Sequence, residues 1–485
     1  MDNVKGVFLL VYTALRRLKR FIKKHILANE RLGKSMLENE RMLDHDQVYS
    51  DVAEWVAKVQ PNDLDASIVV GAKRAALDAI VSVLLGVASK EGCAIIKFVE
   101  NSSNTHGNCA IAGSSETFSC SQAAYSMAAL SQVHDVNDGH ATAGNSGGSY
   151  HPGRVIVPTS LAAAQANDLT GLQFLSAVVI GYDVALNIMG GPLGGSSDAY
   201  GAAALVSCAY NLSVSETAFA IKLSGFSSSQ TGGQDFEVNN LTCAQQAKGA
   251  VDAVELIRCG YPVSNGFNPL RGGFQFNKPI IFGDKLNELY FKPYPACRYI
   301  HPVIDATLKI RHELKGSFDE IKKIEVYTPP GGASGTTHRI GSSKYYKSYQ
   351  FSMSYCVAAS LLDGVFGLDQ VTPSRTANKR IHEIQSKVEF YELDQSLIIK
   401  PISGKIRVEL MDGKVFSHQV DDAYGSPENP LSNESIVKKL SDWTVLTTDD
   451  ACGLLKRVME VDKKDSVEEL MSYIQLLGNK LRKSV

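Results

Sequence analysis

Alanine-rich segments with helical periodicity follow one another between residues 47 and 259, and they constrain the fold more than any other feature. Within 67–92, for example, the apolar residues Val70, Leu77, Ile80 and Leu84 fall on one helical face. Glycine, proline, serine or asparagine bounds each segment, as expected at helix ends. We therefore predict a helical domain whose first part covers 47–289, with helices over 47–59, 64–89, 122–133, 158–167, 171–189, 201–210, 215–224 and 243–259.

The sequence changes character after Tyr290. Runs rich in valine, isoleucine, phenylalanine and tyrosine predict strands, and Asp412-Gly413 is a strong signal for a two-residue hairpin turn. Two helical stretches accompany the strands. These patterns predict a smaller α+β lid domain over 290–426 with an antiparallel sheet, with strands over 324–327, 387–393, 404–410 and 414–420, and helices over 301–314 and 350–364.

Helical periodicity returns in 432–443 and 466–481. The second of these segments opens with Ser466 and Glu469, the spacing of a capping box at a helix N-terminus. We expect residues 427–485 to return to the helical domain. The predicted fold is therefore mainly α, with the α+β lid as an insertion.

Composition limits the partners that such a chain binds. The 485 residues are 44% hydrophobic and 21% charged, which is ordinary for a globular protein with two or more domains. A net charge of -2 creates no overall field for nucleic acid or an anionic membrane, so a small-molecule or protein partner is favoured. Nine singly placed cysteines, without C-x-x-C or metal-ligand spacing, indicate a reducing compartment rather than a disulfide framework.

Residues 1–46 form a basic N-terminal extension. Its apolar run, 7–12, is too short for an integral membrane span and is followed by six lysines and arginines. Three interpretations stay open: an amphipathic helix on a membrane surface, a transit-like presequence, or a solvated helical extension. We expect a cytoplasmic protein, with mitochondrial or membrane-surface association through this extension as the alternative.

The loop 134–153 concentrates side chains capable of acid/base chemistry. Asp135, Asp138, His140 and His151 lie among glycine, serine, asparagine and threonine, between two alanine-rich helical segments. A loop that buries so little apolar surface must be ordered by polar contacts or by a ligand. It is a candidate catalytic loop. Two alternatives are a solvated loop whose polar residues cap helices, and a divalent metal site built from these four residues, although their spacing is not diagnostic.

A second cluster lies at the entry to the α+β domain. Lys292, Cys297, Arg298 and His301 occur within ten residues. Arginine offers a two-pronged donor to a carboxylate, lysine a compact charge, and cysteine a group that can exchange a proton. The alternative is an interdomain linker in which Arg298 pairs with a surface acid.

Two glycine-rich motifs fail their structural context. The G-x-S-x-G peptide at 144–148 has no preceding strand and no helix directly after it, so it does not fit a hydrolase nucleophile. The stretch 190–197 lacks the strand that a dinucleotide-binding turn needs, so no nucleotide site is expected.

From about residue 47 to the C-terminus, the chain resembles the MmgE/PrpD family, which contains 2-methylcitrate dehydratases, cis-aconitate decarboxylases and an iminodisuccinate epimerase. The order and spacing of several segments together make the resemblance specific. These segments are DVNDGH at 135–140, HPG at 151–153 followed by VIVP, LSAVVIGYD at 175–183, KPYPACRYIH at 292–301 and SMSYCVAASLLDG at 352–364.

The resemblance implies a large helical domain with a smaller α+β lid, a homodimer, a site between the domains and no cofactor. It also implies that Asp135 is the active-site aspartate, His151 the loop histidine and Lys292 the lysine at the domain junction. Family chemistry begins by handling a proton beside a carboxylate-bearing carbon.

The chain departs from the family pattern in its complement of cations. No histidine occurs between His151 and His301, and the second family lysine, expected near Val238, is missing. Gly139 stands in place of the usual threonine. Losing one cation and one imidazole predicts weaker binding of a tricarboxylate, with Lys248 available to replace part of the charge.

We therefore expect a cofactor-independent lyase that dehydrates or decarboxylates a small carboxylic acid or related carbonyl compound. Asp135 or His151 would move the proton, Lys292 and Arg298 would hold the anionic group, and His301 would orient this cluster. Asp138, His140 and Cys297 complete the expected substrate-binding set. The alternatives are an isomerase, either an epimerase or a cyclase with Cys297 as second base, and an inactive family member that serves as a binding protein.

Overall fold

The structure is a computed structural model. It describes residues 45–102, 107–140, 150–189, 197–227, 239–263, 275–276, 279–316, 318–330, 345–394, 400 and 402–485. Residues Tyr49–Val485 form one compact unit. Most of the basic extension, the G-x-S-x-G peptide at 144–148 and the stretch 190–196 lie outside the described residues, so the expectations for them stay predictions.

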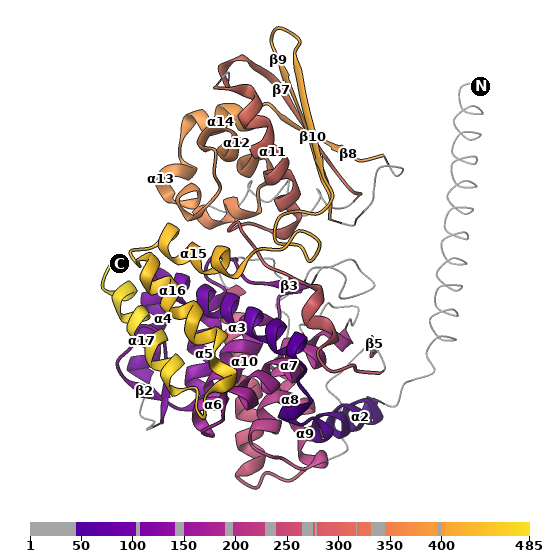
Figure 1. The fold of residues 1–485 in the computed structure, drawn as a ribbon, viewed down its shortest axis with the longest axis vertical. Coiled ribbons are helices and arrows are strands. Elements are labelled where there is room, and N and C mark those ends of the chain that lie inside the picture. Colours follow the sequence, from indigo (N-terminus) through magenta and orange to yellow (C-terminus); the bar gives the residue numbers. More distant parts are fainter. Residues whose placement is uncertain are drawn as a thin grey trace, which may run out of the picture. The chain divides into compact units, whose positions relative to one another are not determined.

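The described residues are mainly helical, which confirms this part of the predicted fold class (Figure 1). α10 packs against α5, α6, α8 and α9, while α3 packs against α5, α6 and α7. The helix bounds lie within a few residues of most predictions, although α4 carries no clear expectation from the sequence. The helices of this part are α2 (His45–Lys58), α3 (Ala66–Val87), α4 (Lys90–Ser102), α5 (Cys120–Ser131), α6 (Gly153–Ala166), α7 (Gly171–Asn187), α8 (Asp198–Ala209), α9 (Val214–Ser224) and α10 (Asn239–Arg258).

Small residues let these helices approach closely. A Cβ atom on Gly86 of α3 would lie 2.0 Å from the carbonyl oxygen of Leu130 in α5. A Cβ atom on Gly201 of α8 would lie 2.3 Å from the carbonyl oxygen of Gly181 in α7. The glycine and alanine content of the sequence is therefore the physical basis of the tight helix packing.

α6 begins at Gly153, five residues before the predicted start at Pro158. The predicted start was wrong. Proline inside a helix normally leaves the carbonyl of the residue four positions earlier without its hydrogen-bond donor, which disfavours a helix that continues through the proline. Here that carbonyl belongs to Arg154, and it accepts a hydrogen bond of 2.9 Å from the Ser131 hydroxyl. A contact from α5 therefore replaces the missing bond, and the helix continues through Pro158.

A four-stranded sheet follows in the order β10-β9-β7-β8. β9 pairs antiparallel with β7 and β10, whereas β8 pairs parallel with β7, so the sheet is mixed and the prediction of an antiparallel sheet was wrong. The connection from β7 to β8 contains the helices α12 (Met353–Asp363) and α14 (Lys379–Gln385), and long connections of this kind allow parallel pairing. The strands are β7 (Ile321–Thr328), β8 (Val388–Glu392), β9 (Gly404–Leu410) and β10 (Val415–Val420).

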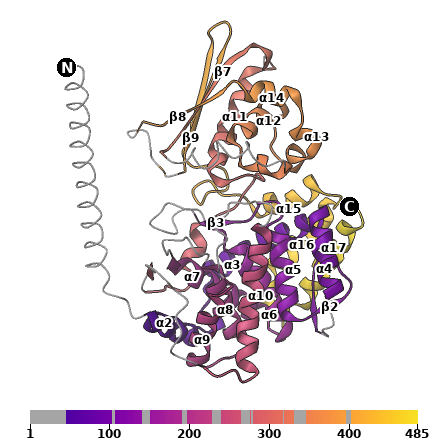
Figure 2. The ribbon, with the colours of Figure 1, turned by 180° about the vertical axis from the view of Figure 1, so that it is seen from behind.

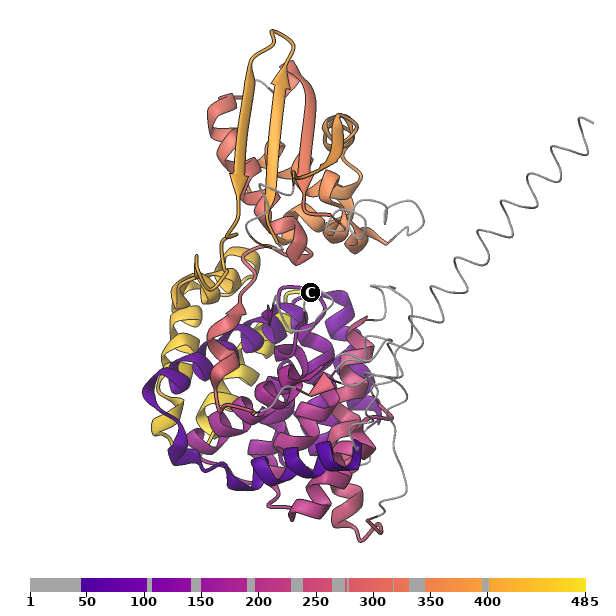
Figure 3. The ribbon, with the colours of Figure 1, turned by 90° about the vertical axis from the view of Figure 1, so that its right-hand side faces the viewer.

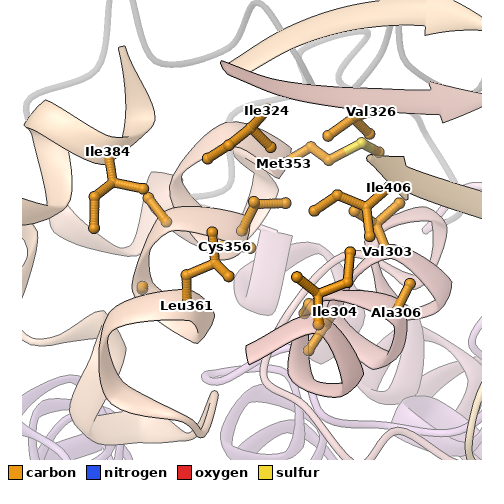
Figure 4. Packing of buried hydrophobic residues seen from close by; sticks show 14 of the residues in the cluster. Val303, Ile304, Ala306, Ile324, Val326, Met353, Cys356, Leu361, Ile384 and Ile406 are labelled. Atoms are coloured by element: carbon orange, nitrogen blue, oxygen red, sulfur yellow. The ribbon is translucent and has the colours of Figure 1, made fainter. Parts of the chain in front are cut away.

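Figures 2 and 3 show the helices α11 (His301–Leu314), α12 (Met353–Asp363), α13 (Pro373–Thr376) and α14 (Lys379–Gln385) beside this sheet. α11 packs against β9, β10 and α12, and α12 packs against α14. Buried apolar side chains from β7, β9 and these helices form one core (Figure 4), including Val303, Ile304, Ile324, Val326, Met353, Cys356, Ile384 and Ile406. This core holds the first residues of α11 in place.

The C-terminal helices α15 (Asn433–Trp443), α16 (Thr448–Met459) and α17 (Glu468–Arg482) all pack against α3. The capping box predicted at α17 was wrong: its N-cap is Val467, and the Ser466 hydroxyl accepts a hydrogen bond from the Glu468 N–H instead. The division into domains at 46/47, 289/290 and 426/427, and the arrangement of the α+β part as a lid, stay predictions.

Short two-residue strands join distant segments: β1 (Cys109–Ala110) with β2 (Thr117–Phe118), β3 (Gly139–His140) with β6 (Leu289–Tyr290), and β4 (Ile188–Met189) with β5 (Gln275–Phe276). Among the described helices, none alone has the length and apolar character to cross a membrane. Only the sharply bent pair α3 and α4 passes that test together.

Candidate active site

The pairing of β3 with β6 brings the two sequence clusters together. Gly139 pairs with Tyr290 and His140 with Leu289, so Lys292 lies two residues after the strand that pairs with the candidate catalytic loop. A Cβ atom at residue 139 would lie 2.4 Å from the Tyr290 hydroxyl and 2.5 Å from the Tyr150 carbonyl oxygen. Glycine is therefore required here by close approach.

Asp135 and Lys292 form the centre of the site. The Lys292 ammonium, whose side chain is fully buried, lies 2.9 Å from Asp135 Oδ2 and donates a hydrogen bond of 3.0 Å to the Asp135 backbone oxygen. The amide of Gln132 donates to the other carboxylate oxygen, Oδ1, at 3.2 Å. Asp135 has a φ of 53°, in the left-handed region that aspartate tolerates better than most residues. This backbone conformation lets the Lys292 ammonium reach both Oδ2 and the backbone oxygen of Asp135.

His151 is half-buried beside this pair. Its Nδ1 lies 2.7 Å from the backbone oxygen of Asp138. Because a carbonyl can only accept, the neutral ring carries its proton on Nδ1 and its lone pair on Nε2. Loss of hydration and the nearby charges of Lys292 and Arg154 hold the pKa of His151 well below its usual range. The imidazole is therefore neutral at pH 7 and able to accept a proton at Nε2.

Asp138 supports the loop from inside the helical part. Its buried carboxyl accepts a short hydrogen bond from the Tyr182 hydroxyl, and burial, together with the charge of Asp78, raises the pKa of Asp138 to about 8. A Cβ atom on Gly153 would lie 2.4 Å from Asp138 Oδ1. Asp138 thus sets the position of His151 through its carbonyl and packs against the start of α6 through its carboxyl.

His140 faces a different partner. Its Nε2 lies 2.8 Å from Glu288 Oε2, and burial lowers the pKa of this histidine. The contact reinforces the β3–β6 pairing. His140 therefore joins the two segments but does not meet Asp135 among the contacts of the described residues.

Arg298 and His301 form a buried pair at the start of α11. The Arg298 guanidinium donates to the carbonyl oxygen of Tyr424 and the hydroxyl of Ser426, and its Cζ lies 4.4 Å from the centre of the Tyr290 ring. His301 Nε2 donates to the Ala296 carbonyl at 3.0 Å, which leaves Nδ1 to accept from Arg298 at 3.5 Å. Burial and the charges of Arg298 and Lys292 hold the pKa of His301 well below its usual range.

Cys297 is half-buried and precedes the short 3-10 helix η3 (Arg298–Ile300). Its backbone N–H donates to the Gln350 carbonyl at 3.0 Å. The interdomain-linker alternative fits poorly with this cluster, because Arg298 is 4% exposed and bonded to buried groups rather than to a surface acid.

The described residues include no group of three or more histidine, cysteine, aspartate or glutamate side chains able to hold a metal ion. The metal alternative proposed four ligands, but Asp135 faces Lys292 and His140 faces Glu288. These residues therefore do not converge on one point. The solvated-loop alternative also fails for Asp135, Asp138 and His140, which are each at most 7% exposed.

Gln132, Arg154 and Gln350 belong to the site but were not predicted from the sequence. Gln132 bonds to Asp135, Arg154 Nη1 donates to Gln132 at 3.4 Å, and the Gln350 amide donates to the carbonyl oxygens of His134 and Pro295 at 2.7 and 2.9 Å. Gln350 lies in the 3-10 helix η6 (Tyr346–Phe351) and is 3% exposed. The one available signal is for Arg154, which directly follows the HPG motif of the resemblance.

Comparison with known proteins shows the family to which the chain belongs. The model of the MmgE/PrpD N-terminal domain matches residues 50–267, and that of the MmgE/PrpD C-terminal domain matches residues 294–453. Together they cover well over half of the chain, which belongs to the MmgE/PrpD family.

A curated relative is the cis-aconitate decarboxylase-like protein oryM of Aspergillus oryzae. It is 25% identical over 496 residues, an alignment that covers 88% of this chain and 97% of the relative. The family and this distant relative support a lyase-type activity at the level of the family.

Proposed function

We propose that the chain is a cofactor-independent lyase that dehydrates or decarboxylates a small carboxylic acid or related carbonyl compound. The observation that carries this proposal is the buried ion pair of Lys292 and Asp135 beside a neutral His151. A base with its lone pair on a known nitrogen, next to a fixed ammonium, suits removal of a proton beside a carboxylate and stabilisation of the resulting charge.

In dehydration, His151 Nε2 takes the proton from the carbon next to the carboxylate. The C–H electron pair moves into an enolate whose oxygen faces the Lys292 ammonium. The enolate then collapses, a carbon–carbon double bond forms, and the C–O bond of the hydroxyl group breaks. The hydroxide leaves as water with the proton returned from the His151 imidazolium, so the protons balance.

In decarboxylation, the C–C bond to the carboxylate breaks and its electron pair passes to the adjacent carbon as CO2 leaves. That carbon then takes a proton from water, because His151 is neutral and has no proton on Nε2 to deliver. Asp135 orients the Lys292 ammonium in both reactions.

The remaining predicted site residues have supporting roles in this proposal. Asp138 fixes the His151 tautomer, His140 holds the loop to β6, and Arg298 and His301 hold Tyr290 and the start of α11. Tyr290 in turn makes an edge-to-face contact with His151, with ring centres 6.1 Å apart. Cys297 stays a candidate for contact with the substrate.

A product screen tests the proposal. A panel of hydroxy acids and unsaturated acids is incubated with the protein, and products are detected by mass: loss of 18 indicates dehydration and loss of 44 decarboxylation. Lys292→Ala and His151→Ala should each abolish turnover, after correction for the folded fraction. His382→Ala is the matched control, because His382 bonds to Gln385 and the Thr376 carbonyl in the α+β part.

Wild-type rates in both site variants would refute the proposed roles. Incorporation of solvent deuterium into the substrate without loss of water or CO2 would instead show the isomerase alternative. A homodimer, and an N-terminal extension that directs the chain to mitochondria or a membrane surface, are further proposals that sedimentation and intact-mass measurements can test.

A further inference from the structure

A pocket of about 370 Å³ lies among the helices, and none of its lining residues belongs to the candidate active site. The end of α2, the short 3-10 helix η1 (Pro61–Asp63), the first half of α7, the end of α8 and the start of α9 surround it. Small-molecule sites in proteins typically measure about 300–1,000 Å³. The pocket is therefore large enough for a small organic ligand.

Helix ends fix the shape of this pocket. α8 is followed by Asn211 in the left-handed region, with a φ of 54°, and the Leu212 N–H donates to the Ser207 carbonyl at 3.0 Å, as in a Schellman motif. At the start of α7, the Gln173 side chain accepts from the Thr170 N–H at 2.9 Å in a capping box. The walls are therefore ordered by the fold itself, which lowers the entropic cost of binding a ligand.

None of the described residues that line the pocket has an ionised side chain. Apolar side chains such as Val56, Pro61 and Leu212 form much of the wall, and burial raises the pKa of the Cys208 thiol, which keeps it neutral at pH 7. Moving an ion from water into surroundings without an opposite charge is strongly unfavourable. The pocket therefore favours an uncharged ligand.

Ser176 and Thr217 contribute buried hydroxyl groups to the pocket. These residues are 4% and 3% exposed, and neither hydroxyl makes a hydrogen bond to another residue in the described part of the chain. Helical hydroxyls often bond back to their own helix, as that of Thr159 does to the Val155 carbonyl at 2.7 Å. Because a buried polar group without a partner is unfavourable, a ligand with a hydrogen-bonding group would be stabilised here.

α7 separates the pocket from the proposed active site. Ser176 and Ala177 line the pocket, whereas the hydroxyl of Tyr182 donates to Asp138. Tyr182 follows Ala177 by five residues, or about 500° of helical rotation, so the two side chains point about 140° apart. A ligand in the pocket therefore lies on the far side of α7 from Asp138 and occupies a second site.

We propose that this pocket binds a small uncharged organic molecule with an apolar stem and one amide or hydroxyl head group. The head group exchanges hydrogen bonds with the hydroxyls of Ser176 and Thr217, and the stem lies against the apolar wall. The proposal does not depend on the lyase function, because the pocket and the proposed catalytic groups share no residue.

Alkylation of Cys208 tests the proposal, because this half-buried thiol lines the pocket. The full-length protein reacts with iodoacetamide at pH 8 in the presence of hexanamide or hexanoate, two probes of the same shape that differ in charge. Peptide mass spectrometry measures the rate at each cysteine. Millimolar hexanamide should slow alkylation of Cys208 at least fivefold, and hexanoate should leave it unchanged. The exposed Cys452 should react at one rate throughout.

Thr217→Val removes one hydroxyl and keeps the shape of the side chain. It should raise the hexanamide concentration that gives half-maximal protection by 3- to 10-fold. Thr307→Val is the matched control, because Thr307 is equally buried and its hydroxyl bonds to the Val303 carbonyl within α11. Equal protection by the two probes, no protection by 50 mM hexanamide, or an unchanged half-maximal concentration in Thr217→Val would each overturn the proposal.

A different occupant of the pocket would also be detected. If Cys208 resists iodoacetamide in the native protein but reacts after unfolding, another segment or a second copy of the chain covers the pocket, and the proposal is wrong. Thermal unfolding identifies any variant that fails to fold. Ser176→Ala, with the same expected shift, then replaces Thr217→Val. Since none of these measurements requires turnover, failure of the lyase proposal leaves this one intact.

Discussion

The ammonium group of Lys292 lies 2.9 Å from the carboxylate of Asp135 and 3.0 Å from the backbone oxygen of the same residue. The lysine side chain is fully buried, and the side chain of its partner is only 10% exposed. A buried charge that loses its partner has neither water nor an opposite charge to stabilise it. This pair is therefore both the proposed reactive centre and a point on which the stability of the chain depends.

Lys292→Met should lower the free energy of unfolding by about 3–5 kcal/mol at pH 7, because Asp135 is left as an unpaired buried charge. Urea denaturation measures the change. The matched control is Lys438→Met, which removes an exposed pair with Asp442 and should cost less than about 1 kcal/mol. Adding Asp135→Asn to Lys292→Met should restore part of the loss, and equal losses in both lysine variants would contradict the prediction.

His151 and His301 should carry their protons on opposite ring nitrogens. The hydrogen bond from His151 goes from Nδ1 to the Asp138 carbonyl, whereas that from His301 goes from Nε2 to the Ala296 carbonyl. Nitrogen NMR of labelled imidazoles at pH 6 should show both rings neutral, since both pKa values lie well below the usual range. His151→Gln and His301→Gln assign the signals, and an imidazolium signal from either ring at pH 6 would be inconsistent with the structure.

Asp138 should make stability depend on pH. Its pKa is raised from 3.8 to about 8 in the folded chain by burial and the charge of Asp78. Between those values the unfolded chain has released the proton that the folded chain retains, so the free energy of unfolding falls as pH rises from about 4 to about 8. Asp138→Asn should therefore gain stability relative to wild type between pH 5 and pH 8, as measured by urea denaturation.

Asp183 provides a second, separate instance of the same effect. Burial raises its pKa to about 8, and its carboxylate accepts from the Gly283 N–H at 2.7 Å. The free energy of unfolding should therefore depend less steeply on pH in Asp138→Asn than in wild type, and less steeply still in the double variant with Asp183→Asn. Parallel pH curves for wild type and Asp138→Asn would rule out the effect.

Gln350→Glu should reduce turnover while keeping the fold. The amide of Gln350 donates to the carbonyls of His134 and Pro295, which belong to the segments that carry Asp135 and Lys292. A carboxylate has the same shape but no donor, so both carbonyls lose a partner and the two segments lose their shared support. We expect a loss of 10- to 100-fold in kcat on any substrate identified by the product screen.

Gln370→Glu is the control for this substitution. Gln370 is also buried, and its amide donates to Asp363 in the α+β part. Gln370→Glu should change the stability of the protein, but its kcat, after correction for the folded fraction, should equal that of wild type. Similar losses of kcat in the two variants would mean that Gln350 has no particular role in positioning the site.

Regular elements with strong local patterns were predictable from the sequence. α11 and β9 begin and end at the predicted residues, because a period of 3.6 or 2 and clear end signals act within the segment itself. The β9–β10 hairpin follows from Asp412-Gly413, where Gly413 has a φ of 86°. The helix start at Gly153 and the parallel pairing of β8 escaped prediction, because a contact from Ser131 and a strand distant in sequence decided them.

The candidate site divides in the same way. Asp135, His151 and Lys292 could be selected from the sequence because their residue types and motif order suit acid/base chemistry, and the structure brings Lys292 into contact with Asp135. The contact of His140 with Glu288, and the hydrogen bonds from Arg298 to Ser426 and the Tyr424 carbonyl, could not be predicted. Two-residue strands such as β3 and β6 carry no periodicity from which their pairing could be read.

The sequence by itself determined that this chain is a mainly helical member of the MmgE/PrpD family, because hydrophobic periodicity and motif order are properties of short segments. Only the tertiary structure decided the chemistry of each group. The lone pair of His151 is on Nε2 because the Asp138 carbonyl takes the proton on Nδ1, and Arg154 stands near Asp135 because Gln132 bridges them. Such relations depend on burial and on contacts between distant segments, and no local pattern encodes them.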